Sequence, residues 1–241
     1  MPLFSIITVC YNSEKTIERT LNSVLNQTCQ DYEYIIVDGK STDNTLNLIN
    51  SYKERFGNKL KIISEPDKGI YDAMNKGIRL SEGTLVGIVN SDDYYEADTL
   101  ENVKNNYDPN KKYQILYGII RNVNEEGDIQ TIHFSHHSLM QEEMIAHPTC
   151  FVSNTIYKEK SMYSLEYKSS SDYDFLLKMY NDPGVAFIPV YHILSNFTIG
   201  GESHKFDSHL ETFKVWKKYG CISNKRYLLI LLSTYAKRII R

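Results

Sequence analysis

The chain has 241 residues, of which 41% are hydrophobic and 24% are charged, and this is enough apolar material for a packed α/β domain. Its formal net charge of −3 argues against a nucleic-acid-binding protein. Its four cysteines are widely spaced and form no CxxC pair, which predicts reduced thiols rather than a disulfide framework or a zinc site. Because neither a signal-peptide pattern nor a membrane-length apolar run is present, we expect a cytoplasmic protein.

Strand and helix patterns alternate through the first half of the chain. β-branched runs at 3–9, 33–37, 59–64 and 84–89 predict strands that are buried on both faces of a parallel sheet. Helices are expected between them, and Ser13 is predicted to cap the first. A second helix is expected over 44–56 and a third within 67–80. This order predicts βαβ units and an α/β fold.

The second half combines a hairpin with further strands and helices. Alternating patterns at 113–123 and 129–134 flank a turn and predict the hairpin. We expect a loop feeding a strand over 146–152, a helix over 171–180, a strand over 185–197 and a glycine-bearing loop over 198–204. Helices are expected over 208–219 and 225–240. Without a linker or repeat, the chain is predicted to form one domain, 1–205, with a helical extension, 206–241.

Acidic residues follow two of the predicted strands. The carboxyl ends of parallel strands are where ligands bind in such sheets. Asp92 and Asp93 could share Mg²⁺ or Mn²⁺ with substrate phosphates, or could cap a helix that starts near Ala97. Asp38, which precedes Gly39, could accept a hydrogen bond from a uracil imide or a ribose hydroxyl, or could belong to a simple turn.

Two common nucleotide motifs are missing from the sequence. No GxGxxG follows a strand, which disfavours a dinucleotide-binding domain, and no GxxxxGK[ST] indicates a P-loop. The side chains that the strand ends offer are suited instead to holding a base, a ribose and a metal-bound diphosphate. They are Thr8, Asp38, Ser41, Asp92 and Asp93.

Seven segments in order resemble one enzyme family. They are SIITVCYNSEKTIERTLNSVLNQT, YIIVDGKSTDNT, EPDKGIYDAMNKGI, GIVNSDDYY, AHPTCFV, SDYDFLLKM and IGGES, and the resemblance that they carry covers about residues 3–205. Together they closely resemble family 2 glycosyltransferases, nearest to bacterial enzymes of polysaccharide, capsule or colanic-acid-type biosynthesis. The resemblance implies the GT-A fold and metal-dependent, inverting transfer of a hexosyl or N-acetylhexosaminyl group. It also implies a nucleotide-diphosphate sugar donor, expected to be UDP-linked, and a saccharide or lipid-linked acceptor.

The resemblance also implies roles for particular residues. Those expected to bind the nucleotide sugar are Thr8, Tyr11, Asn12, Asp38, Ser41, Lys68, Asn75 and Asp92. Within that group Asp38 is similar to the family acid that contacts the base, and Asp92 is expected to face the ribose. Asp93 is implied as the metal ligand, with Asp92 and His204 as further candidates.

Asp172 falls where the family has its general base. It matches the second acid of the family's Glu-Asp pair, and Ser171 stands where the first acid is usual. Without the resemblance, Asp172 could equally be the N-cap of the helix that follows. His147 precedes a proline and is expected to be structural rather than a metal or phosphate ligand.

Two other functions and one other location compete with these expectations. A nucleotidyltransferase would carry a glycine-, arginine- and lysine-rich signature after the first strand, where this chain has Cys-Tyr-Asn-Ser. A catalytically silent nucleotide-sugar-binding module is disfavoured because Asp92, Asp93 and Asp172 are present together. Segment 225–241 mixes apolar bulk with cations. It is therefore expected either to touch the inner face of the cell membrane or to pack on the domain or a partner subunit.

Overall fold

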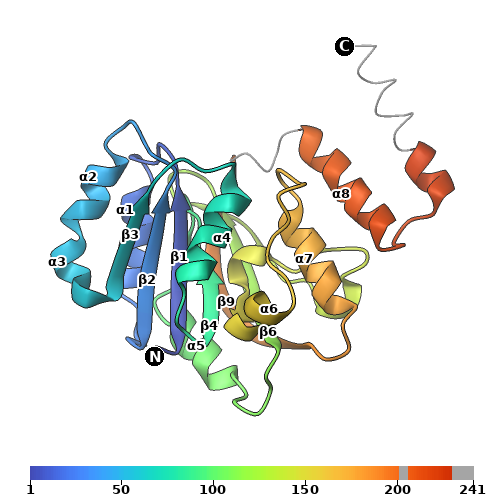
Figure 1. Cartoon of the computed structure of the whole chain (residues 1–241), viewed down its shortest axis with the longest axis horizontal. Helices are drawn as coiled ribbons and strands as arrows, with labels where there is room; N and C mark the ends of the chain where they lie inside the picture. Colours follow the sequence, from blue (N-terminus) through green and yellow to red (C-terminus); the bar gives the residue numbers. More distant parts are fainter. Residues whose placement is uncertain (201–205, 230–241) are drawn as a thin grey trace.

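The computed structural model describes residues 1–200 and 206–229 and contains one nine-stranded sheet (Figure 1). The strands are β1 (Phe4–Cys10), β2 (Tyr32–Asp38), β3 (Leu60–Ser64), β4 (Leu85–Ile88), β5 (Tyr94–Tyr95), β6 (Gln114–Val123), β7 (Ile129–His133), β8 (Phe151–Ser153) and β9 (Ala186–Thr198). The helices are α1 (Ile17–Leu25), α2 (Thr45–Ser51), α3 (Lys53–Phe56), α4 (Ile70–Leu80), α5 (Thr99–Asn106), α6 (Asn154–Glu159), α7 (Ser171–Tyr180) and α8 (Phe206–Lys218). Three 3₁₀ turns, η1 (Gly57–Lys59), η2 (His137–Leu139) and η3 (His147–Thr149), complete the assigned elements.

The sheet is mixed, with most strands running in one direction. Its order is β3-β2-β1-β4-β8-β6-β9-β5, with β7 beside the second half of β6. Strands β1 to β4 pair in parallel, and β6 pairs in parallel with β9. β8 runs antiparallel to both β4 and β6 and joins these two parallel groups. The predicted α/β class and mostly parallel sheet are therefore confirmed.

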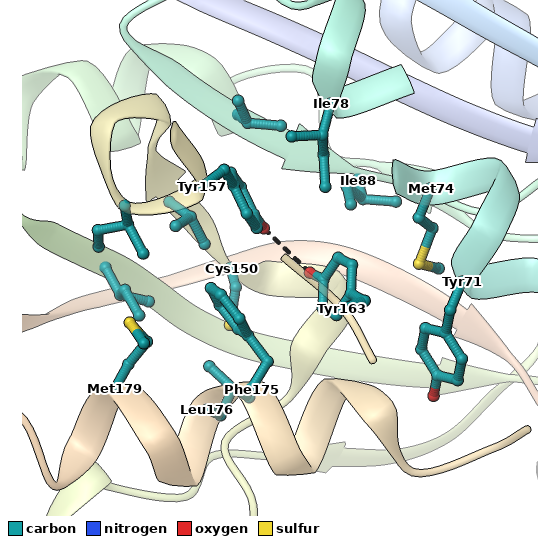
Figure 2. Close-up of a cluster of buried hydrophobic side chains, with 14 of the residues drawn as sticks. Tyr71, Met74, Ile78, Ile88, Cys150, Tyr157, Tyr163, Phe175, Leu176 and Met179 are labelled. Atoms are coloured by element: carbon teal, nitrogen blue, oxygen red, sulfur yellow. Dashed lines mark hydrogen bonds between the residues drawn. The ribbon is translucent and has the colours of Figure 1, made fainter. Parts of the chain in front are cut away.

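Two hydrophobic cores cover the two faces of the sheet. Side chains alternate between the faces of β1, so Ile7 and Val9 belong to one core and Phe4 and Ile6 to the other. Helices α4, α6, α7 and α8 contribute to the first core, and α1, α2, α3 and α5 to the second. Figure 2 shows part of the first core, where aromatic rings from α4, α6, α7 and the loop before α7 meet.

The C-terminal helix α8 packs on α7 rather than standing apart from the domain. The Trp216 indole donates a hydrogen bond of 2.7 Å to the Tyr173 hydroxyl, and Lys218 pairs with the buried Asp174 carboxylate. Val215 is fully buried in the same core as α7. Helix α8 agrees with the helix expected over 208–219, whereas the division into a domain and an extension stays a prediction. A further helical stretch covers 224–229.

Three expectations, two about helix caps and one about an uninterrupted helix, were wrong. The N-cap of α1 is Thr16, and Ser13 instead pairs its hydroxyl with that of Ser91. Helix α5 begins at Thr99, too late for Asp92 or Asp93 to cap it. The predicted helix over 44–56 is divided at residue 52 into α2 and α3. Within the described ranges, no helix is long and apolar enough to cross a membrane.

Candidate functional site

The site lies where β1, β2 and β3 end side by side. Register places Cys10 beside Asp38, and Asp38 beside Ser64. The Asp38 side chain is fully buried, and its carboxylate accepts hydrogen bonds from the Ser41 and Ser64 hydroxyls at 2.5 and 2.6 Å and from the Ser41 amide. Burial, followed by the nearby Asp38 charge, raises the pKa of the Cys10 thiol, so Cys10 stays neutral.

The loops that follow β1 and β2 are tied together by hydrogen bonds above this edge. The Asn12 amide donates to Ser41 Oγ at 2.9 Å, and Asn12 Oδ1 accepts from the Thr42 amide at 2.8 Å. Asn12 has a φ of 51°, a left-handed backbone that asparagine tolerates better than most residues. Tyr11 remains 62% exposed at the rim. Four of the residues predicted to bind the nucleotide sugar, at positions 11, 12, 38 and 41, are therefore neighbours.

Thr8 does not reach this surface. Its side chain is fully buried, and its hydroxyl shares a hydrogen bond of 2.8 Å with the Tyr34 hydroxyl inside the core. Local sequence could not reveal this, because the partner lies on the neighbouring strand.

The two adjacent acids after β4 differ in their surroundings. Asp93 has no exposed surface; its carboxylate accepts from the Thr198 amide at 3.0 Å and from Asn90 Nδ2 at 3.4 Å. Asp92 is half-buried, and its carboxylate accepts no hydrogen bond from another residue in the described part of the chain. Its backbone carbonyl instead accepts from Arg19 and from the Thr198 hydroxyl.

The charges of this acidic turn are only partly compensated. Burial raises the pKa of Asp92, and burial together with the Asp92 charge raises that of Asp93 well above its ordinary value. Beside them, the buried Asn90 Oδ1 has no hydrogen-bond partner among the residues that the structure describes. A half-exposed carboxylate and an unpaired amide oxygen are the donor types that Mg²⁺ and Mn²⁺ accept when substrate phosphates complete the coordination. The described residues contain no closed cluster of three or more His, Cys, Asp or Glu side chains.

Two residues predicted to contact the nucleotide sugar, Lys68 just before α4 and Asn75 within it, differ in their surroundings. Lys68 is exposed, and its backbone amide donates to Asp72 in the first turn of α4. Asn75 is buried, and both ends of its amide bond to the backbone of Tyr163, at 2.9 and 3.1 Å. Asn75 thus anchors the loop before α7 and does not face the strand ends.

Asp172 lies in the first turn of α7 and is partly exposed, whereas the N-cap is Ser170. Helix α7 runs toward the start of β9, so its first turn lies on the side of the sheet where the parallel strands β1, β2 and β3 end. Asp172 Oδ1 accepts hydrogen bonds of 2.9 Å from the Tyr71 hydroxyl and from the Tyr173 amide. Asp172 is therefore not the N-cap.

Two buried polar residues, His147 and Ser171, are neighbours of Asp172. His147 shares a hydrogen bond of 2.7 Å with the Tyr163 hydroxyl, as expected of a structural histidine. Burial lowers its pKa, and the Asp172 charge opposes this shift. Ser171 is fully buried, and its hydroxyl has no hydrogen-bond partner within residues 1–200 and 206–229. His204 lies outside the described residues.

Sequence reasoning missed Arg19 and Tyr71. Both lie in ordinary amphipathic helices, and their partners are 73 and 101 positions away. No local pattern separates them from other helix residues.

Comparisons with known proteins agree with this arrangement. The model of the family described as "Glycosyl transferase family 2" matches residues 5–166. The chain is 31% identical over 207 residues to a PGL/p-HBAD biosynthesis glycosyltransferase of Mycobacterium bovis (strain BCG / Pasteur 1173P2), covering 84% of this chain and 80% of the relative. It is 32% identical over 185 residues to chondroitin synthase of Pasteurella multocida (strain Pm70), covering 74% of this chain and 19% of that protein.

The fold is similar to that of TarS from S. aureus. A crystal structure of TarS residues 1–349 in complex with UDP-GlcNAc superposes with a TM-score of 0.71 at 25% identity. The match covers 88% of this chain and 64% of that one, so the chain spans less than two thirds of the TarS fragment. With the sheet, its helices and the family match all in agreement, the chain belongs to glycosyl transferase family 2 and is a glycosyltransferase of the GT-A fold.

Proposed function

We propose that this glycosyltransferase moves a sugar from a UDP-linked donor to a saccharide or lipid-linked acceptor, with inversion at the anomeric carbon. The observation that carries the proposal is the position of Asp172. This partly exposed carboxylate lies in the first turn of α7, on the side of the sheet where β1, β2 and β3 end, and one of its oxygens is held by Tyr71. A carboxylate in that position is suited to act as a general base.

The donor assignment rests on the loops at the strand ends. Asp38, Asn12 and Ser41 form one hydrogen-bonded group, and Tyr11 is exposed beside it. These groups match the edges of a base and a ribose in hydrogen-bonding capacity. The solved TarS complex contains UDP-GlcNAc, which supports a UDP-sugar as the donor here.

We further propose that Asp92, with the amide oxygen of Asn90, holds the divalent cation, and that Asp93 positions the turn that carries them. This reverses the order that the family resemblance implies for the two acids. It is supported by the burial and internal hydrogen bonds of Asp93, which leave Asp92 as the more accessible carboxylate. When bound, Mn²⁺ or Mg²⁺ would offset the charge that develops on the diphosphate leaving group.

The chain's own residues then define the transfer. Asp172 takes the proton of the acceptor hydroxyl as the acceptor oxygen bonds to the anomeric carbon and the bond from that carbon to the diphosphate breaks. One displacement from the face opposite the leaving group inverts the anomeric carbon. A retaining route through a glycosyl-enzyme would need a second carboxylate as nucleophile, and no residue is assigned that role here.

The place of the reaction in the cell is inferred from relatives. One matched protein is named for PGL/p-HBAD biosynthesis and another for chondroitin synthesis. These names support a role in glycan biosynthesis, and we propose that it serves cell-surface polysaccharide assembly at the cytoplasmic side of the membrane. The tail proposed to touch the membrane, 225–241, lies largely outside the described residues.

A thermal-shift panel of nucleotide sugars with and without Mn²⁺ tests the donor. A donor at one hundred times its Kd adds about 2.7 kcal/mol to the free energy of unfolding. For a chain of this size, that raises Tm by about 5–10 °C. The rise in Tm should require Mn²⁺, and the Asp92→Asn variant should lose this rise. The control is Asp31→Asn, which changes an exposed acid just before β2, at the opposite end of the strands, and this variant should keep the rise. If no UDP-sugar raises Tm, the donor assignment is wrong.

The base is tested with Asp172→Asn. This variant should retain the donor-induced rise in Tm and lose the release of UDP from that donor, because its amide cannot accept the proton. Release at the wild-type rate would contradict the assignment of Asp172 as the base.

A further inference from the structure

We propose that Tyr71 is a positioning residue for the base: its hydroxyl holds Asp172 Oδ1, so that Oδ2 alone faces the acceptor and receives its proton. This inference rests on the proposed role of Asp172. It assigns a function to a tyrosine in α4, a helix that otherwise belongs to the donor side of the molecule.

The two oxygens of Asp172 are not equivalent. Oδ1 accepts from the Tyr71 hydroxyl and from the Tyr173 amide, both at 2.9 Å. Oδ2 accepts no hydrogen bond from any residue that the structure describes. A carboxylate oxygen that already accepts two hydrogen bonds is a weaker proton acceptor than its free neighbour, so the proton is directed to Oδ2.

Tyr71 is itself held firmly. It is 6% exposed, and its ring lies 5.7 Å from that of Tyr163, between α4 and the loop before α7 (Figure 2). The same first turn of α4 carries Asp72, which accepts the Lys68 amide. One helical turn therefore fixes both the segment next to the donor loops and the carboxylate on the acceptor side.

The hydroxyl of Tyr71 remains a donor throughout the working pH range. Burial, and then the charge and hydrogen bond of Asp172, raise the pKa of Tyr71 far above its ordinary value of 10.0. In the transfer the acceptor O–H breaks, its proton passes to Oδ2, and its oxygen bonds to the anomeric carbon as UDP leaves. Tyr71 neither gains nor loses a proton in this step.

Three buried titratable groups that interact with Asp172 stay uncharged, and the one charged neighbour on its helix is paired. Burial raises the pKa of the Cys150 thiol and of the Tyr163 phenol, and burial lowers the pKa of His147. Asp174, on the same helix, is paired with Lys218. Tyr71 is thus the one neutral side chain among these that donates a hydrogen bond to the base.

The test compares Tyr71→Phe with Tyr157→Phe. Tyr157 is buried in the same aromatic cluster, and its hydroxyl bonds to that of Tyr163 rather than to Asp172 (Figure 2). The readout is kcat for UDP release, with water as the acceptor, measured beside the Kd of the donor. The full chain is assayed with saturating Mn²⁺ and the UDP-sugar that gives the largest rise in Tm.

Without the Tyr71 hydroxyl, Oδ1 is no longer held and Oδ2 is no longer directed to the acceptor, so Tyr71→Phe should lower kcat about tenfold. Tyr157→Phe should leave kcat unchanged, and both variants should bind the donor with unchanged Kd.

Each outcome has a distinct meaning. If Asp172→Asn is inactive but Tyr71→Phe has the kcat of the wild type, the positioning role of Tyr71 is refuted and the proposed base stands. If Tyr157→Phe lowers kcat equally, the effect is not specific to the contact and the inference also fails. If Asp172→Asn is active, the proposed function itself fails.

Discussion

Glu211 in α8 offers a direct test of whether the C-terminal helix is part of the catalytic domain. Its carboxylate accepts hydrogen bonds of 2.8 to 3.0 Å from the amides of Lys168 and Ser169 and from the Ser169 hydroxyl. These two residues lie just before α7, whose first turn carries Asp172. Removing the carboxylate should therefore loosen the segment that places the base.

The magnitude follows from the number of hydrogen bonds and the exposure of the group. Hydrogen bonds to a charged group contribute about 1.5–3 kcal/mol each when buried. Glu211 is only partly buried, so solvent screening reduces this. We expect Glu211→Ala to lower the free energy of unfolding by about 2 kcal/mol and Tm by about 4–8 °C. Glu211→Gln, which keeps one acceptor oxygen, should cost about half as much.

The pH dependence has a definite sign. Burial alone would raise the pKa of Glu211, but the hydrogen bonds from Lys168 and Ser169 outweigh it and lower the pKa below the ordinary 4.5. The stabilisation is thus present above about 4.5 and is lost as pH falls through the folded-state pKa. The gap between wild type and Glu211→Gln should close in that range.

Urea unfolding monitored by tryptophan fluorescence at pH 7 and at pH 3.5 measures both quantities. Glu166→Gln, the same substitution at an exposed side chain two positions before Lys168, serves as the control and should change stability by less than about 0.5 kcal/mol. Equal stability of Glu211→Ala and the wild type at pH 7 would refute the view that α8 secures this segment.

Three further substitutions test individual contacts. Asn75→Ala should cost about 2–4 kcal/mol in urea unfolding, because it leaves the buried amide and carbonyl of Tyr163 unpaired, whereas calorimetry should give an unchanged Kd for UDP; a large rise in Kd would show that Asn75 contacts the nucleotide. Gly83→Ala should cost about 1–3 kcal/mol, since its Cβ would lie 2.5 Å from the Ser5 amide nitrogen; Gly184→Ala, where the nearest atom is 3.2 Å away, should be tolerated, and equal Tm values for the two variants would contradict this. Lys218→Met should cost about 1–3 kcal/mol at pH 7 by leaving the buried Asp174 unpaired. Burial lowers the pKa of Lys218, but Asp174 outweighs it and the pKa rises above 10.5, so the difference should persist up to that pH and shrink only above it.

The elements that the sequence predicted well are those set by local composition. The β-branched runs that became β1 and β2 are buried along their whole length, as a central parallel strand requires. Because parallel strands end at one edge, the meeting of Asp38 with the loop at Asn12 followed from the strand order alone.

Features that depend on distant partners could not be predicted in this way. From the sequence, the Thr8 hydroxyl was expected to bind the nucleotide, but in the structure it forms a hydrogen bond with Tyr34 of the neighbouring strand. Ser13 is a residue type that commonly caps helices, but its hydroxyl forms a hydrogen bond with that of Ser91, 78 residues later. The difference between Asp92 and Asp93 likewise depends on Thr198, whose amide arrives at the end of β9. Such choices are made by tertiary contacts that outweigh local preference.

The bond from the Thr198 amide to Asp93 also sets the order in which the enzyme can mature on the ribosome. The acidic turn after β4 is synthesised 105 residues before the strand end that completes it. At about 5–20 residues per second, the two are separated by roughly 5–20 s of translation. During that interval the nascent chain has its first four parallel strands but an unfinished acidic turn, with the carboxylate of Asp93 still lacking its main donor. The first four parallel strands can therefore fold early, but the acidic turn reaches its final hydrogen bonding only after β9 has been synthesised.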